Sequence, residues 1–107
     1  MPVTAKEFRQ IALSMPGAVE SAHMNHPDFR VGGKIFATLA YPNKDWGMVA
    51  LAPAEQGFFT SAEPKAFTPV KGKWGQQGAT SVLLKAVKKT SLKKAMEAAW
   101  KRAQDKK

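Results

Sequence analysis

In residues 28–40, DFRVGGKIFATLA, two runs rich in apolar residues flank a Gly-Gly pair. This pattern predicts a β-hairpin made of a short strand, a tight turn and a longer strand: Phe29–Val31, Gly32-Gly33 and Lys34–Leu39. Glycine reaches the positive φ angles of a two-residue hairpin loop without steric cost. The predicted register pairs Val31 with Lys34, Arg30 with Ile35, and Phe29 with Phe36.

Helical signals mark both ends of the chain. Thr4 and Glu7 have the spacing of a capping box, and the helix that they open should end near Ser14, ahead of Pro16. Near the C-terminus, apolar residues recur at helical spacing: Leu92, Ala95, Met96, Ala99, Trp100 and Ala103. This stripe predicts a long helix, capped by Ser91 or Thr90, whose Trp100 faces the core.

The middle of the chain supplies further strands and one short helix. Strands are predicted at Val19–Met24, Trp46–Leu51 and Thr80–Lys85, and a helix from Pro53 to about Thr60. Asn25-His26-Pro27 is expected to break the first strand, Ala66–Val70 to form an extended edge or loop, and residues 71–79 to form a Gly-rich loop. The order favours one α+β domain, residues 1–107, with the N- and C-terminal helices packed on one side of an antiparallel sheet.

Composition narrows the function classes. The chain of 107 residues has no cysteine, which excludes disulfides, thiolate metal sites and a Cys nucleophile. The N-terminus has no apolar run of the secretory type, and no run approaches the length of a membrane span. We therefore expect a cytoplasmic monomer without a membrane partner.

The positive charge is concentrated near the C-terminus. Residues 1–84 carry eight Lys/Arg and six Asp/Glu, a net of +2, whereas residues 85–107 carry nine and two, a net of +7. This asymmetry favours a polyanionic partner, DNA first, although a solvated lysine face on a soluble helix is the alternative. The candidate contacts are Lys85, Lys88, Lys89, Lys93 and Lys94.

The predicted helix start adds a physical argument for an anion surface. Lys93 and Lys94 fall in its expected first turn, where the macrodipole disfavours each exposed cation by ~0.3–1 kcal/mol. Lys88 and Lys89 lie just before this turn, so the helix start is a candidate phosphate cradle. Neutralising ~4–6 phosphates would give a log–log salt slope of about −4 to −5.

Secondary contacts are expected outside the last helix. Lys34 belongs at the hairpin tip, and Lys71 and Lys73 flank Trp74 in the Gly-rich loop. Cations beside an aromatic ring can hold phosphates and stack on a base. The alternative is that Trp74 folds back to cap the core.

Catalysis, metals and cofactors are not indicated. His23 and His26, three apart in an extended segment, would lie on opposite faces and could not chelate together. Neither histidine lies in a motif with a hydroxyl nucleophile and an acid, and the Gly-rich loop lacks the GK[ST] ending of a phosphate loop. We expect the protein to have no enzymatic activity and to bind no metal and no cofactor. One alternative stays open, a small-ligand pocket near His23, His26, Trp46 and Trp74.

Three segments carry a resemblance to the MmcQ/YjbR family of small bacterial proteins. They are Leu13–Gly17 with Glu20, His26–Ala37, and the residues Trp74-Gly75, Gln77-Gly78-Ala79-Thr80; the ending Ala98-Ala99-Trp100 also fits. The resemblance implies a CyaY-like fold with a double-wing motif and a DNA-binding label. In this chain the stretch 87–94 is more basic than is usual for the family. Iron binding, known from the related frataxins, is not expected, because the first helix offers only Glu7 in place of an acidic ridge.

Together these observations predict a DNA-binding protein whose binding is mainly electrostatic and weakly sequence-specific. A non-enzymatic adaptor that docks on an acidic protein is the alternative from a different class, and the small-ligand binder is the third.

Overall fold

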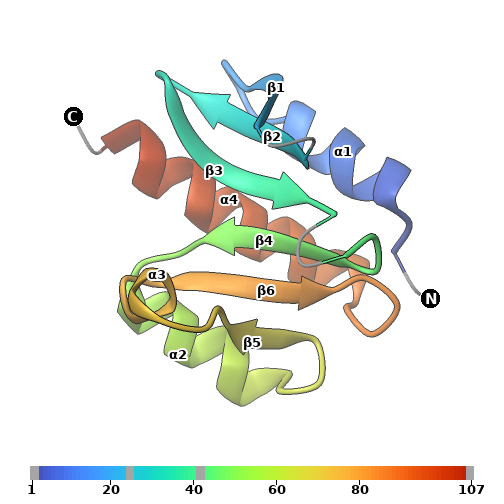
Figure 1. The fold of residues 1–107 in the computed structure, drawn as a ribbon, viewed down its shortest axis with the longest axis vertical. Coiled ribbons are helices and arrows are strands. Elements are labelled where there is room, and N and C mark those ends of the chain that lie inside the picture. Colours follow the sequence, from blue (N-terminus) through green and yellow to red (C-terminus); the bar gives the residue numbers. More distant parts are fainter. Residues whose placement is uncertain (1–2, 24–25, 41–42, 106–107) are drawn as a thin grey trace.

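The computed structural model describes residues 3–23, 26–40 and 43–105. These residues form four helices and six strands (Figure 1), with the following bounds: α1 Ala5–Leu13, β1 Val19–His23, β2 His26–Val31, β3 Lys34–Leu39, β4 Trp46–Ala50, α2 Pro53–Ala62, β5 Phe67–Pro69, α3 Lys73–Gln76, β6 Ala79–Leu83 and α4 Lys89–Asp105. The strands form one sheet in the order β1-β2-β3-β4-β6-β5, and every neighbouring pair is antiparallel.

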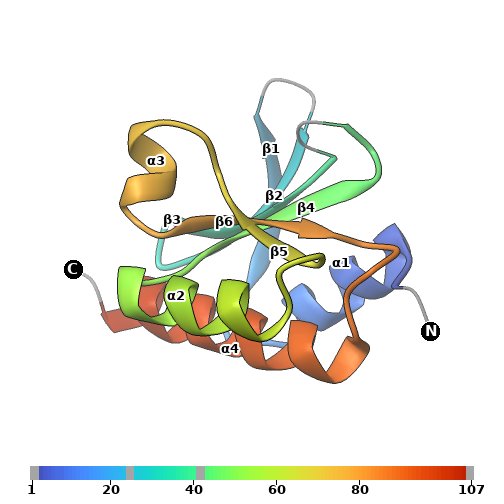
Figure 2. The same ribbon diagram turned by 90° about the horizontal axis from the view of Figure 1, so that it is seen from below.

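The helices are divided unequally between the two faces of the sheet. Figure 2 shows α1, α2 and α4 on one face, while α3 lies on the other. The core lies between the sheet and the larger helical layer, and its biggest fully buried side chains include Phe8, Phe29, Phe36, Leu92 and Met96. The predicted α+β class, with both terminal helices on one side, is confirmed.

Local sequence signals explain how α1 begins. Thr4 Oγ1 accepts a hydrogen bond from the Glu7 backbone N–H at 3.1 Å, and Glu7 Oε1 accepts one from the Thr4 N–H at 3.0 Å. This reciprocal pair is the predicted capping box, and it satisfies two backbone donors that the helix leaves without intrahelical partners. Ser14 follows α1 as its C-terminal cap, as predicted.

The central hairpin forms where predicted, but part of its register differs. Val31 pairs with Lys34 and Arg30 with Ile35, whereas Phe29 pairs with Ala37 instead of Phe36. A β-bulge at Phe29/Arg30 causes the shift, because it leaves Phe36 as one extra residue on β3. The bulge lets both phenylalanine rings enter the core, and both are fully buried.

The first strand ends before His26, as predicted, but His26 and Pro27 do not form a break, because they begin the next strand. The chain reverses between β1 and β2, so both residues belong to β2, and His23 pairs directly with His26. Met24, the predicted end of the first strand, and Asn25 lie outside the described residues. Placing a break at Asn25-His26-Pro27 did not anticipate that the chain turns back to begin β2, and the argument that the two histidines are separated along one extended segment does not apply, because they lie on two paired strands.

Two further segments near the sheet edge were anticipated in part. Residues 67–69 form β5 at the edge, as predicted, where Pro69 does not interrupt a central ladder. The loop predicted for residues 71–79 contains one helical turn, α3. Trp100 packs against the core as expected, and its Nε1–H donates to the Pro16 carbonyl at 2.8 Å.

Candidate nucleic-acid interface

A long acid-free stretch contains most of the candidate contacts. No Asp or Glu occurs between Glu63 and Glu97, although this stretch holds eight of the seventeen Lys and Arg residues in the chain. All eight are exposed lysines: Lys65, Lys71, Lys73, Lys85, Lys88, Lys89, Lys93 and Lys94. The fold places seven of them in two regions with different surroundings, and Lys65 lies between α2 and β5, outside both.

The first region surrounds the beginning of α4, and we call its members the α4-start lysines: Lys85, Lys88, Lys89, Lys93 and Lys94. Lys89 Nζ lies 3.6 Å from Glu7 Oε2 in an ion pair between α4 and α1. Within the described ranges, no ion pair involves the other four. The pKa of Glu7 is lowered, first by the backbone hydrogen bond with Thr4 and also by the charge of Lys89.

The structure changes the argument for a phosphate cradle at the beginning of α4. The helix begins at Lys89, so Thr90 and Ser91 belong to its first turn and do not cap it from outside. Lys93 and Lys94 consequently lie in the second turn, where the macrodipole penalty inferred for them is smaller. Ser91 Oγ donates to Glu63 Oε2, which brings a carboxylate close to the first turn. The exposed lysine side chains, more than the helix end itself, are therefore the groups that can contact phosphate.

The second region is the α3 platform, which we define as residues 71–77. Its backbone packs very closely on the neighbouring chain, since a Cβ on Gly75 would lie 1.6 Å from the Val70 carbonyl oxygen. A Cβ on Gly78, just beyond the platform, would lie 1.8 Å from the Leu51 carbonyl oxygen. Gln56 Nε2 also donates to the carbonyls of Gly75 at 2.9 Å and Ala79 at 3.0 Å. These contacts fix the platform to Val70 and α2, and the residues directly after it to Leu51 and α2.

Trp74 does not cap the core, the alternative weighed from the sequence. Its residue exposure is 43%, and Lys71 and Lys73 beside it are exposed as well. Trp46, in contrast, is half-buried at the beginning of β4. The α3 platform thus carries a partly exposed indole ring and two exposed lysines that are close to it in sequence, on the sheet face opposite the larger helical layer (Figure 2).

That face of the sheet also contains polar residues that sequence analysis did not select as a group. Asp28 is fully buried, and its carboxylate accepts hydrogen bonds from Arg30 Nε at 2.8 Å and Nη2 at 3.2 Å. Asp28 raises the pKa of Arg30, chiefly through this hydrogen bonding. Thr38, paired with Asp28 in the ladder, is 2% exposed, and its Oγ1 has no hydrogen-bond partner in the structure. The Asp-x-Arg spacing was the available signal, because alternate residues of a strand share a face.

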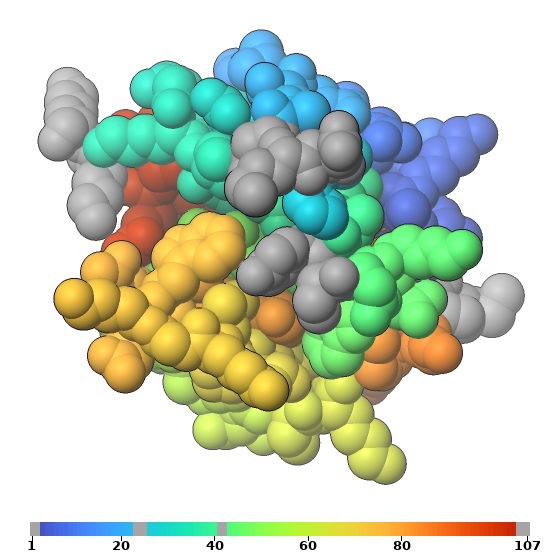
Figure 3. All heavy atoms as spheres, in the orientation of Figure 1, coloured from blue at the N-terminus to red at the C-terminus, as the bar shows by residue number. Residues whose placement is uncertain are grey.

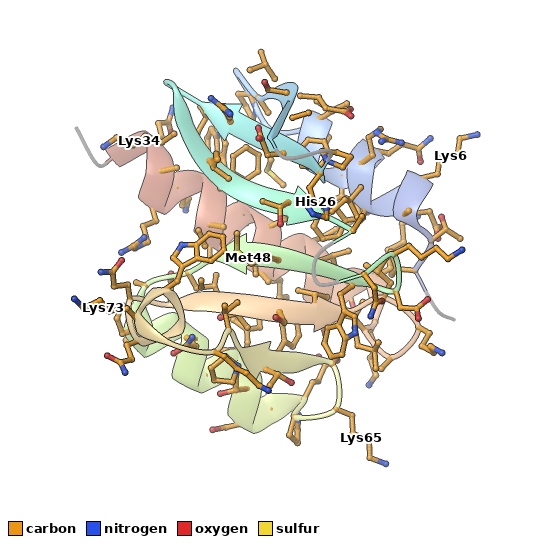
Figure 4. All side chains as sticks on the ribbon, in the orientation of Figure 1. Lys6, His26, Lys34, Met48, Lys65 and Lys73 are labelled. Carbon is orange, nitrogen blue, oxygen red and sulfur yellow. The ribbon has the colours of Figure 1, made fainter. Side chains whose placement is uncertain are left out.

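Figures 3 and 4 view this side of the molecule. Figure 3 shows the surface hollowed between β3 and the α3 region. In Figure 4, Lys34 and Lys73 both project at the left edge, while His26 and Met48 lie over the central strands. The beginning of α4 lies at the opposite end, on the right of Figure 1. The fold therefore places Lys34 and Lys73 on one side, apart from the α4-start lysines, so the predicted contacts form two surfaces.

The pocket predicted near the two histidines stays a prediction. The side chain of His23 lies outside what the structure describes, whereas His26 is half-buried. Two shallow depressions of ≈ 170 and ≈ 250 Å³ lie on either side of the turn between β6 and α4, and neither is lined by His26, Trp46 or Trp74. Across the described ranges, no group of three or more His, Cys, Asp or Glu residues has the arrangement of a metal site. The helices described there are too short or too polar to cross a bilayer.

Comparison with known proteins gives a family and a fold. A family model described as YjbR matches residues 13–102. No curated protein matches the chain. The crystal structure of Deinococcus radiodurans protein DR2400, which carries the domain DUF419, superposes with a TM-score of 0.82 at 15% identity, covering 97% of this chain and 80% of that one. At this identity the likeness concerns the fold alone.

Proposed function

The chain belongs to the YjbR family, and we propose that it is a non-enzymatic DNA-binding protein that recognises the phosphate backbone mainly through charge. The proposal requires no cofactor or metal. It takes the protein to act as a monomer with weak sequence preference, because backbone contacts carry no direct base information.

One observation carries the proposal, namely the exposure of the acid-free stretch. Its eight lysines are all exposed, and among the described residues only Lys89 pairs with a carboxylate. Exposed lysines that form no ion pair remain available to a polyanion, and their contact with phosphates releases condensed counterions. The α4-start lysines are the densest part of the stretch and are assigned to duplex DNA.

The test is fluorescence anisotropy of a labelled duplex at ~50 and ~200 mM salt, a range that exposes counterion release. With four unpaired α4-start lysines in contact, the log–log salt slope should be about −3.6. Replacing Lys85, Lys88, Lys93 and Lys94 by Gln should remove most of the affinity and of the slope. A matched variant, with Lys34, Lys65, Lys71 and Lys73 replaced by Gln, has the same net charge and should retain most duplex binding. Equal loss in both variants would contradict the assignment, and no wild-type binding at low salt would refute the function.

Docking on an acidic protein is the second candidate, and Phe58 favours it. This α2 side chain is 66% exposed and lies outside the core, although its ring packs edge-on against Phe59 at a centroid distance of 5.2 Å. Exposed aromatic residues are enriched at protein interfaces. Competition distinguishes the candidates: a protein adaptor should keep its partner in the presence of excess duplex at physiological salt, whereas a DNA-binding protein should release it.

A further inference from the structure

We propose that the α3 platform is a stacking site for one unpaired base of a single-stranded nucleic acid, with Trp74 as the stacking surface. The inference deepens the proposed function and rests on it. It assigns single-stranded nucleic acid to this side of the molecule. The α4-start lysines, in contrast, do not distinguish a single strand from a duplex.

The first support is the rigid attachment of the turn that carries Trp74. Gly75 and Gly78 allow the backbone to approach the Val70 and Leu51 carbonyls more closely than any side chain would permit. Gln56, reaching from α2, holds the carbonyls of Gly75 and Ala79 with one amide group. An anchored turn loses little conformational freedom when a ligand binds, which is the advantage of a pre-organised site.

The second support is the orientation of the indole relative to that attachment. Gly75 is buried, while Trp74 immediately before it is 43% exposed. Successive residues of a helical turn point in directions about 100° apart, so a turn that buries one position presents the preceding one sideways or outward. The close backbone packing that buries Gly75 therefore leaves part of Trp74 open to solvent.

The third support is the charge around the ring, which selects the occupant. Lys71 and Lys73 are exposed beside Trp74, and the platform lies within the acid-free stretch. Lys34 projects on the same side of the molecule (Figure 4). An aromatic ring flanked by cations fits a strand that offers bases and phosphates in alternation. An apolar protein segment would leave these lysines without complementary charge.

A duplex cannot use this ring without being opened. Both faces of every internal base in a duplex are covered by the neighbouring base pairs, so a base would have to be unstacked before it could contact the ring. An unpaired base has a free face, and stacking on an aromatic side chain is tolerant of sequence. Trp74 should therefore add affinity only for single strands.

The experiment compares three oligonucleotides by anisotropy at one low salt concentration: a single-stranded oligothymidine, a duplex of equal length, and a single strand of equal length made of abasic sites. The proteins are wild type, Trp74→Ala and Trp74→Phe. Phe58→Ala is the matched control, because it removes another exposed aromatic ring, on α2, across the sheet from α3 (Figure 2). Circular dichroism melting confirms that each variant is folded.

Trp74→Ala should weaken binding of the oligothymidine by about 5- to 150-fold, the range for loss of one base stack. Trp74→Phe should retain most of the wild-type affinity for the oligothymidine, and Phe58→Ala should bind it as tightly as wild type. Binding of the duplex and of the abasic strand should change by less than about 2-fold, because neither offers a free base. This pattern supports the inference.

An unchanged oligothymidine affinity in Trp74→Ala overturns the inference, and it leaves the proposed function intact if the duplex still binds. An equal loss on the oligothymidine and the abasic strand also overturns it, because Trp74 would then act without a base. Absence of wild-type binding to all three ligands overturns the proposed function and this inference together.

Discussion

The beginning of α4 and the α3 platform belong to the same acid-free stretch, yet different interactions hold them in place. Near the beginning of α4, side chains from distant elements supply carboxylates: Glu7 pairs with Lys89, and Glu63 accepts from Ser91. At the α3 platform the contacts come from backbone packing and from Gln56. Lysine content alone therefore does not define a binding surface. The groups that surround each lysine decide whether it stabilises the fold or remains available to a ligand.

The largest effect on stability is expected from a substitution that disrupts the packing of the α3 platform. Gly75→Ala should lower the free energy of unfolding by about 3 kcal/mol, because its Cβ collides with the Val70 carbonyl, which is backbone and has little freedom to move. Urea unfolding measures the change. Gly57→Ala in α2 is the control, since its Cβ meets no atom within 4 Å and should stabilise the helix by up to about 1 kcal/mol. Equal effects of the two substitutions would show that the close packing is not rigid.

The two regions should also differ in how strongly each contributes to the salt dependence of duplex and single-strand binding. Replacing Lys93 and Lys94 by Gln should reduce the duplex salt slope by about 1.8, and replacing Lys71 and Lys73 should reduce the single-strand slope by about 1.4. Each pair should have a smaller effect on the other ligand. Anisotropy titrations over a salt series give both slopes. If both pairs reduced both slopes equally, the two regions would form one surface.

A smaller effect on stability is expected at the beginning of α4, where Ser91 has a structural role. Ser91→Ala removes the hydroxyl that donates to Glu63 and should cost about 1 kcal/mol of stability, typical of one hydrogen bond. Thermal melting measures this cost, and duplex affinity should remain unchanged because no lysine is lost. A marked change in duplex affinity would mean that Ser91 itself contacts the ligand.

The smallest effect is a pH dependence from Glu7. Its pKa in the folded protein is lowered, so the ionised carboxylate stabilises the fold above the ordinary value near 4.5, and this stabilisation is lost as the pH falls through the lower folded value. Glu7→Gln lacks this contribution. Urea midpoints measured from pH 7 down to pH 3 should therefore fall more steeply for wild type than for Glu7→Gln. Parallel curves would contradict the role given to Glu7.

Local sequence patterns predicted the elements whose signals lie within one segment. The capping box at Thr4 and the Gly32-Gly33 hairpin formed as expected, because neighbouring residues alone determine them. The α4 stripe packed on the core for the same reason, although its first residue was misplaced. The charge asymmetry also follows directly from the sequence.

Features that depend on distant residues were not predictable in this way. The ion pair of Lys89 joins α4 to α1, and the anchors of Gly75 come from Val70 and Gln56. The pairing of His23 with His26 depends on a chain reversal that the local sequence does not reveal. Such contacts require the relative placement of elements, which the pattern of a single segment does not contain.

The most direct test of the account crosses two variants with two ligands at one salt concentration. The variants are Trp74→Ala and the fourfold Gln replacement of Lys85, Lys88, Lys93 and Lys94, and the ligands are a duplex and an oligothymidine of equal length. The account predicts that Trp74→Ala weakens only the single strand, while the fourfold variant removes most duplex binding. If the two variants weakened both ligands in the same ratio, the division of the acid-free stretch into two surfaces would be contradicted.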